Sequence, residues 1–161
     1  MQIREIKIEV KEFGSLSELP EQDRKLVRKA REASNNAYAP YSKFNVGAAL
    51  LLENGKIITG NNQENVDFTD GLCAERVALF YAQSKYPDIP VKAIAITAQN
   101  TKGLLDAPTK PCGSCRQVML ETEFRNKTPM RIILDGKKKI QILEGAGNLL
   151  PLAFKPGTLD E

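Results

Sequence analysis

Cys73-Ala74-Glu75-Arg76 and Pro111-Cys112-Gly113-Ser114-Cys115-Arg116-Gln117 are the two stretches from which the fold and the chemistry of this chain are best read. Together they contain all three cysteines of the 161 residues, and the chain has no histidine. The first stretch places a glutamate two residues after its cysteine, and the second spaces its cysteines as C-x-x-C behind a proline. Each stretch stands where a helix is expected to begin, so the sequence predicts two helix N-termini that carry thiols.

Three cysteines without a histidine favour a metal site with one open position. Zinc prefers four tetrahedral ligands, and a catalytic zinc keeps three protein ligands and leaves the fourth place to water. Cys73, Cys112 and Cys115 supply three thiolates, so a closed structural site would need a ligand from outside the chain. The missing histidine also excludes Ser-His-Asp and Cys-His catalytic systems. We therefore expect one zinc ion per chain, held by these cysteines.

The residues around the cysteines suit such a centre. A helix N-terminus favours anions and depresses the pKa of a thiol. Arg76 and Arg116, each close to a predicted ligand, are expected to offset more of the thiolate charge. Glu75 lies in the first turn of the helix that follows Cys73 and can reach a metal-bound water without binding the metal. We expect zinc to lower the pKa of that water and Glu75 to act as the catalytic proton shuttle.

Two other interpretations remain open for the cysteines. Scattered cysteines are more often small buried hydrophobic residues than ligands. A lone C-x-x-C is also typical of a thioredoxin-like redox pair. The coincidence of C-x-E with P-C-x-x-C, each at a helix start, favours the metal site, because neither alternative requires Glu75.

Hydrophobic periodicity places these motifs in an α/β fold. A helical spacing of apolar residues predicts a helix over about 21–36, and further helices are expected over about 74–85 and 113–121. Alternating or continuous apolar runs predict strands over 2–10, 44–52, 56–60, 91–98, 130–134 and 139–142, with Asn54-Gly55 as a hairpin turn. Helices that alternate with strands indicate a sheet covered by helices, partly antiparallel. No linker interrupts the pattern, so residues 1–161 are expected to form a single domain.

Composition limits the possible partners. Apolar residues make up 42 % and charged residues 27 %, and 23 basic against 20 acidic residues give a net charge of only +3. The one short basic run is typical of a solvated turn, so no nucleic-acid partner is expected. No apolar run approaches the roughly 18–20 residues of a membrane span, and the N-terminus lacks the apolar core of a signal peptide. We therefore expect a cytoplasmic protein without a membrane partner.

Four motifs together resemble the small, zinc-dependent cytidine deaminases. Residues 39–49 are similar to the family's A-P-Y-S-x-F-x-V-G-A-A, and residues 62–65 to its N-x-E-N. C-A-E-R and P-C-G-x-C-R-Q match without a change, and the likeness runs from about Tyr38 to Phe154. The resemblance implies a three-layer α/β/α fold with a mixed sheet of about five strands. It also implies a homotetramer that deaminates cytidine and deoxycytidine to uridine and deoxyuridine in pyrimidine salvage, by attack of zinc-bound hydroxide on C4.

The resemblance also assigns roles to residues outside the cysteine motifs. Asn62 and Glu64 would bind the ribose hydroxyls, Ala74 would contact the substrate, and Phe44 would pack against the nucleoside. For Phe44 a place in the core remains a rival interpretation. Phe68 and Phe154 are candidates for a contribution to a neighbouring subunit's site.

Two departures from the family's pattern stand out. Phe68-Thr69-Asp70 replaces the Tyr-Pro-Leu found in many relatives, which leaves a contact to the 5′ end of the sugar in doubt. Residues 1–16 precede the usual start and are expected to form an N-terminal extension. Two rival functions also share the zinc motifs: a blasticidin-S deaminase-like aminohydrolase, and a non-catalytic zinc-bound module that only binds nucleosides. The N-x-E-N motif favours a plain ribose over the first rival, and Glu75 argues against the second.

Overall fold

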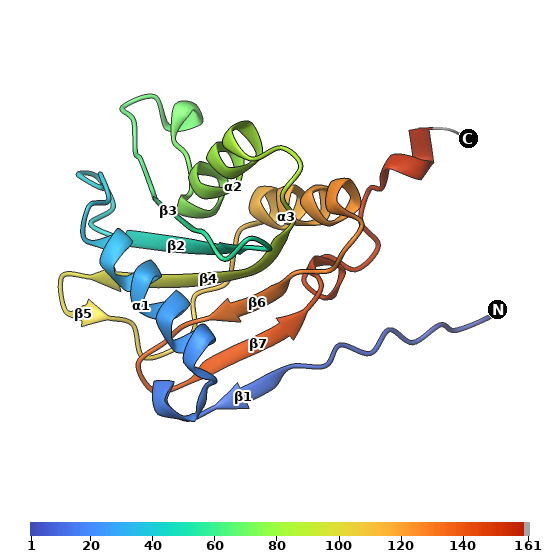
Figure 1. Ribbon diagram of the computed structural model, residues 1–161, viewed down its shortest axis with the longest axis horizontal. Helices are drawn as coiled ribbons and strands as arrows, with labels where there is room; N and C mark the ends of the chain where they lie inside the picture. Colours follow the sequence, from blue (N-terminus) through green and yellow to red (C-terminus); the bar gives the residue numbers. More distant parts are fainter. Residues whose placement is uncertain (160–161) are drawn as a thin grey trace.

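The structure is a computed structural model and describes residues 1–159 (Figure 1). Its strands are β1 (Lys11–Phe13), β2 (Asn45–Leu52), β3 (Ile57–Asn61), β4 (Val91–Asn100), β5 (Gly103–Leu104), β6 (Arg131–Leu134) and β7 (Ile140–Glu144). Its α-helices are α1 (Glu21–Ser34), α2 (Ala74–Lys85) and α3 (Gly113–Asn126). Short 3-10 helices are η1 (Leu16–Glu18), η2 (Phe68–Asp70), η3 (Ala146–Asn148) and η4 (Pro156–Leu159). Within these residues no helix combines the length and apolar character that crossing a membrane requires.

One mixed sheet of seven strands forms the middle layer. Its order is β1-β7-β6-β4-β2-β3, with β5 beside β4; β4 and β6 run parallel, and the other neighbours are antiparallel. Helix α1 covers one face, and α2 and α3 cover the other (Figure 1). The predicted three-layer α/β/α fold is confirmed. The sheet has slightly more strands than the about five that the resemblance implied, because the apolar pattern contains no clear signal for the short strands β1 and β5.

The position of β2, inside the sheet and covered on both faces, explains why its sequence is apolar without interruption. Its residues Ala48 and Leu50 face the core beneath α2 and α3, whereas Ala49 and Leu51 face the core beneath α1. Successive side chains of a strand point to opposite faces, so a strand covered on both sides must be apolar throughout. This arrangement places two helix layers on a rigid sheet.

The strand predicted over residues 2–10 is absent, and β1 begins only at Lys11. The register of β1 with β7 explains where the pairing stops. Lys11 lies opposite Ile142, so a longer ladder would place Glu9 opposite Glu144, and like charges directly opposite destabilise a sheet. Strand β7 also ends at Glu144, and Gly145 follows with a positive φ of 87°. Residues 1–10 therefore leave the sheet as an exposed arm (Figure 1).

Close packing on Gly60 fixes the start of α2. A Cβ atom at Gly60 in β3 would lie 2.6 Å from the carbonyl oxygen of Ala74 and 2.7 Å from the amide nitrogen of Ala78. Only a glycine lets the first turns of α2 rest directly on the strand. Because Cys73 is the N-cap of α2, this contact also sets the height of its thiol above the sheet.

A buried ion pair fixes the loop that leads to α3. Asp135, fully buried at the end of β6, accepts two hydrogen bonds of 2.8 Å from Arg31 of α1 and one of 2.8 Å from the hydroxyl of Thr97 in β4. A Cβ atom at the next residue, Gly136, would lie 2.6 Å from the carbonyl carbon of Ala107. Loop 105–111 thus packs on a turn that is anchored to α1 and to the neighbouring strand β4.

We predict that Gly60→Ala lowers the free energy of unfolding by about 1–3 kcal/mol, because the new methyl group overlaps two backbone atoms of α2. Chemical denaturation of the purified protein measures the change. Gly147→Ala is the matched control, since a Cβ atom there meets nothing within 4 Å. Equal stability of the two variants would contradict the role given to the close contact.

Candidate metal centre and adjoining cavity

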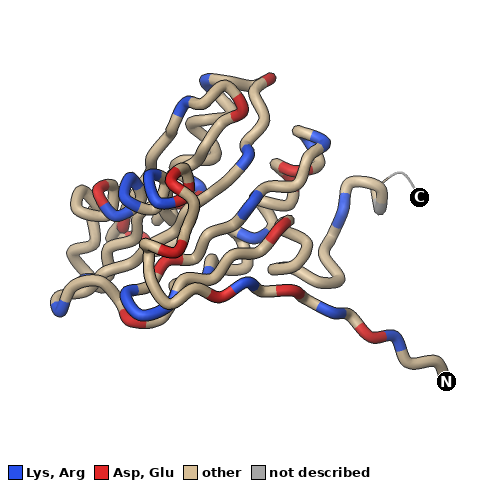
Figure 2. Tube along the Cα trace, turned by 60° about the horizontal axis from the view of Figure 1, so that its bottom comes forward, with Lys and Arg blue, Asp and Glu red and all other residues tan. Residues whose placement is uncertain are grey.

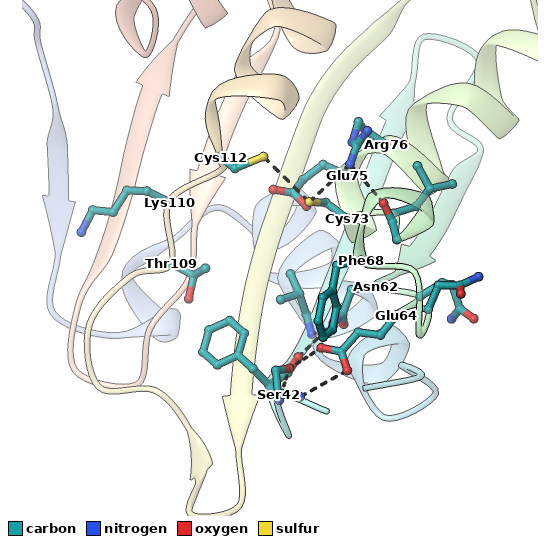
Figure 3. Close-up of a pocket in the computed structure, with 16 residues that line it drawn as sticks. Ser42, Asn62, Glu64, Phe68, Cys73, Glu75, Arg76, Thr109, Lys110 and Cys112 are labelled. Carbon is teal, nitrogen blue, oxygen red and sulfur yellow. Dashed lines mark hydrogen bonds between the residues drawn. The ribbon is translucent and has the colours of Figure 1, made fainter. Parts of the chain in front are cut away.

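The three cysteines meet at the N-termini of two helices. Cys73 is the N-cap of α2, Cys112 is the N-cap of α3, and Cys115 lies buried in the first turn of α3. The three Sγ atoms lie within 4.8 Å of one another, and those of Cys73 and Cys112 are 3.8 Å apart. Figure 3 shows these two side chains pointing toward each other from separate helices. The fold thus brings together thiols that are far apart in sequence.

The cluster fits a zinc ion. Thiolates hold zinc at about 2.3 Å, and two sulfurs at tetrahedral positions around one ion are then about 3.8 Å apart. Within residues 1–159, no fourth cysteine or carboxylate joins the group of side chains that could hold the metal. The donor set is therefore three thiolates with one position left open. A redox pair would not require Cys73 in the cluster, and Cys112 is exposed rather than buried in the core.

The surroundings of the cluster favour negative charge on one of its three sulfurs, that of Cys73. A hydrogen bond from Cys115 lowers the pKa of the Cys73 thiol to about 5, and Arg76 contributes to the shift, with its Nη2 atom 3.9 Å from the Cys73 sulfur. The same hydrogen bond, together with burial, raises the pKa of Cys115. Arg116 instead donates to the carbonyl oxygens of Pro111 (2.9 Å) and Leu149 (2.8 Å). Of the two arginines, Arg76 contacts a thiol, whereas Arg116 fixes the backbone around α3.

Glu75 lies beside the sulfur cluster with little access to water. Its side chain is in the first turn of α2 and is 4 % exposed. Burial raises the pKa of this carboxyl to about 7, and the charge of Cys73 acts in the same direction. A carboxyl with a pKa near neutrality can both accept and donate a proton during one reaction. The geometry places a group able to accept and donate protons next to the candidate metal site.

A cavity of about 600 Å³ begins at this carboxyl and opens away from the cluster. Its volume falls in the range of small-molecule sites. The lining residues are Ser42, Phe44, Val46, Asn62, Gln63, Glu64, Asn65, Phe68, Gly71, Leu72, Cys73, Glu75, Arg76, Thr109, Lys110 and Cys112. Figure 3 shows Glu75 and the cysteines at one end, and Ser42, Asn62 and Glu64 grouped at the other.

Asn62 joins the cavity wall to the sheet. Its Oδ1 atom accepts a hydrogen bond of 2.7 Å from the amide of Val46, and its Nδ2 atom donates one of 2.9 Å to the carbonyl of Phe44. The side-chain amide thus forms the pair of hydrogen bonds that the backbone of a further β3 residue would form with β2. An amide group offers two donors and two acceptor positions, so one of each remains for a ligand.

Glu64 anchors the loop in front of β2. One carboxylate oxygen accepts from the amides of Tyr41 (2.9 Å) and Ser42 (3.2 Å), and the other accepts from the Ser42 hydroxyl. These hydrogen bonds, with the one from the Ser42 hydroxyl foremost, lower the pKa of Glu64. The cavity therefore presents an ionised carboxylate at the end remote from Glu75.

The remaining predicted residues differ in their relation to the cavity. Phe44 is part of the cavity wall and belongs to neither core cluster, which favours its role as a ligand contact. Ala74 is fully buried in the core beneath α2 and does not line the cavity. Phe68 in η2 lines the mouth, with its ring 5.7 Å from that of Tyr41. Phe154 is exposed on the C-terminal tail and lines no part of this chain's own cavity.

Thr109 and Lys110 line the cavity although sequence reasoning did not single them out. The hydroxyl of Thr109 and the Nε atom of Arg76 are buried without a hydrogen-bond partner among the described residues. Both belong to residues of the cavity wall, so a ligand can supply their partners. The only signal for Thr109 and Lys110 was their position directly before P-C-x-x-C, which is too weak to assign a role.

Comparisons with known proteins agree with this chemistry. Residues 20–129 match the family described as "Cytidine and deoxycytidylate deaminase zinc-binding region". The chain is 47 % identical over 130 residues to a cytidine deaminase of Sporosarcina psychrophila, covering 81 % of this chain and 89 % of that protein. It is 38 % identical over 137 residues to the cytidine deaminase of Mycobacterium tuberculosis, covering 84 % and 92 %. The crystal structure of cytidine deaminase from Burkholderia pseudomallei aligns with a TM-score of 0.68 at 39 % identity, covering 81 % of this chain and 97 % of that one.

We predict that the purified protein contains about one zinc ion per chain and that Cys112→Ala reduces the metal content to near zero, because two thiolates hold zinc poorly. Elemental analysis after dialysis measures the content. Ser114→Ala, which changes a neighbour but no ligand, is expected to keep the metal. An intact protein without zinc would contradict the assignment of the cluster.

Proposed function

Because the chain belongs to the cytidine and deoxycytidylate deaminase family, a family of aminohydrolases, we propose that it hydrolyses cytidine and deoxycytidine to uridine and deoxyuridine with release of ammonia. One observation carries the proposal: a buried carboxyl with a raised pKa stands between a three-thiol cluster and a cavity of nucleoside size. A carboxyl suited to proton transfer, a cluster of thiols that could hold a metal and a polar end thus line one cavity.

The polarity of the cavity suggests how a nucleoside would lie. The ribose hydroxyls need acceptors and donors, and Asn62 and Glu64 offer both at the end remote from the metal. The pyrimidine then extends toward Glu75, with the ring of Phe44 available to pack against the nucleoside. Ala74 follows Cys73 at the start of α2, and we propose that its backbone rather than its buried methyl group meets the base.

Glu75 would perform every proton transfer. Zinc, when bound by the three cysteines, supplies Lewis acidity that makes water nucleophilic at neutral pH. Glu75 accepts the proton that this water loses and delivers it to the ring nitrogen N3 of the pyrimidine. After the C4–O bond has formed, the same carboxylate takes the proton of the new C4 hydroxyl and hands it to the amino group. The C4–N bond then breaks, ammonia leaves, and the C4 carbonyl of the product forms. A pKa near 7 suits a group that must work in both directions.

Two rival functions give different outcomes in simple assays. A blasticidin-S deaminase-like enzyme would prefer that antibiotic, so turnover of blasticidin S and cytidine by the same preparation distinguishes the two. A zinc-bound nucleoside-binding module would bind cytidine without releasing ammonia. The buried Glu75 favours an enzyme. Burying a carboxyl costs free energy, and a protein that only binds nucleosides has no need of a buried carboxyl at this position.

We further propose that the enzyme is a cytoplasmic homotetramer that serves pyrimidine salvage. Its three free thiols suit a reducing compartment. The ring of Phe154 is exposed, although its carbonyl accepts a hydrogen bond from Gln117 of α3, so we propose that this ring closes a neighbouring subunit's cavity. Phe68, exposed at the cavity mouth, is the residue on the receiving side.

We predict that Glu75→Gln lowers kcat for cytidine by about two to four orders of magnitude or more, because an amide cannot shuttle protons. The fall in ultraviolet absorbance during conversion to uridine measures the rate. The variant is expected to keep its zinc, since Glu75 is outside the sulfur cluster. Activity near that of the unaltered enzyme, with zinc in place, would rule out the proposed shuttle.

We predict that Glu64→Gln raises KM for cytidine about tenfold to a hundredfold and changes kcat less. The substitution removes a charge-assisted acceptor and turns an amide donor toward the backbone amides of Tyr41 and Ser42. Steady-state kinetics measure both constants. Glu53→Gln is the control, since Glu53 pairs only with Lys92 at the surface and is expected to leave both constants unchanged. A loss confined to kcat would contradict the sugar-binding role.

A further inference from the structure

The exposed N-terminal arm, residues 1–10, is unusual for an extended segment because one of its faces is apolar. Ile6, Ile8 and Val10 lie on the same side of an extended chain and are 51 %, 44 % and 39 % exposed. Among the described residues, the arm forms no side-chain hydrogen bond and no backbone hydrogen bond outside the sheet ladder, whose register begins at Lys11. The arm also precedes the part of the chain that matches the deaminase family.

The arm continues the edge of the sheet. Strand β1 pairs with β7 on one side only, so its other edge carries free N–H and C=O groups. Such an edge is a template for another strand. Strand β7 cannot take much more of the arm itself, because it ends at Glu144, and a ladder extended beyond Val10 opposite Leu143 would place Glu9 opposite that carboxylate. A partner for the arm must therefore come from outside the chain.

The charges of the arm are arranged so that it is complementary to itself. Along the face opposite to the isoleucines, acidic and basic residues alternate: Glu5, Lys7, Glu9 and Lys11. Figure 2 shows this alternation of red and blue along the arm. Two copies paired antiparallel with Ile8 opposite Ile8 would place Glu5 opposite Lys11 and Lys7 opposite Glu9, each pair occurring twice. On the other face Ile6 would lie opposite Val10.

Other registers lose this match. A shift that keeps the faces places either Lys7 opposite Lys7 and Glu5 opposite Glu9, or Glu9 opposite Glu9 and Lys7 opposite Lys11. Opposite charges across two strands stabilise a sheet and like charges destabilise it. A shift by one residue places apolar side chains opposite charged ones. Among the neighbouring alignments, only the one centred on Ile8 satisfies both faces.

We propose that residues 4–12 of two copies of this chain pair as antiparallel strands about Ile8 and join their sheets edge to edge. Nine paired residues span about 30 Å, a length sufficient for a strand ladder. The alternating charges of one arm would thereby be neutralised by those of the second arm, which a single chain cannot provide. The interface is separate from the cavity and does not depend on the proposed deaminase activity.

Cysteine cross-linking of the full-length protein tests the register. Ile8→Cys is expected to form a disulfide-linked dimer in oxidised glutathione, because the two sulfurs would face each other. Ile6→Cys alone is expected not to cross-link, whereas a mixture of Ile6→Cys and Val10→Cys is. The unaltered protein controls for its own thiols. Cross-linking of Ile8→Cys no faster than this control would overturn the proposal.

A charge exchange tests the pairing without altering composition. Lys7→Glu and Glu9→Lys each create two like-charge pairs per dimer and are expected to weaken association about tenfold. The double variant Lys7→Glu/Glu9→Lys restores opposite charges and is expected to associate as the unaltered chain does. Sedimentation equilibrium measures all four proteins, so any assembly through other surfaces is common to them. Equal association of the single and double variants would show that the arms do not pair in this way.

Discussion

The meeting of two helix N-termini is the constraint on which the site depends. Helices α2 and α3 lie on the same face of the sheet, and their first turns bring three sulfurs within 4.8 Å of one another. Packing alone would not favour this arrangement, because thiolates repel one another. The amide groups of both helix ends and the guanidinium of Arg76 offset part of that repulsion. A bound cation would complete the compensation, so the metal centre and the helix packing support each other.

Contacts remote from the sulfurs hold these helix ends in place. Gly60 sets α2 directly on β3, and Asp135 ties the loop before α3 to the opposite layer through Arg31. Between the two helices, Glu75 is held in a region from which water is largely excluded. Its raised pKa follows from this position rather than from any special property of the residue. The fold thus determines the proton affinity of the group on which the proposed chemistry depends.

The sequence was most informative where chemistry and periodicity coincide. The bounds of α2 were predicted without error and the three thiols were predicted to meet, because C-x-E and P-C-x-x-C coincide with helix starts. Strand β5 and the cavity residue Thr109 could not be predicted, since both depend on how loop 101–111 packs on other elements. The prediction of a strand over residues 2–10 was wrong. An alternation of apolar and charged residues shows that a segment can pair in a sheet, but it does not show which strand is its partner.

Asn62 serves both the sheet and the cavity, and this limits which substitutions the protein can accept during evolution. Its side chain completes the hydrogen bonding between β2 and β3 and also faces the cavity. A substitution that altered ligand choice there would at the same time remove hydrogen bonds at the end of the pairing between β2 and the edge strand β3. Changes in ligand choice are therefore more accessible through cavity-wall residues that form no such hydrogen bonds to β2, for example Phe68 or Lys110, than through Asn62.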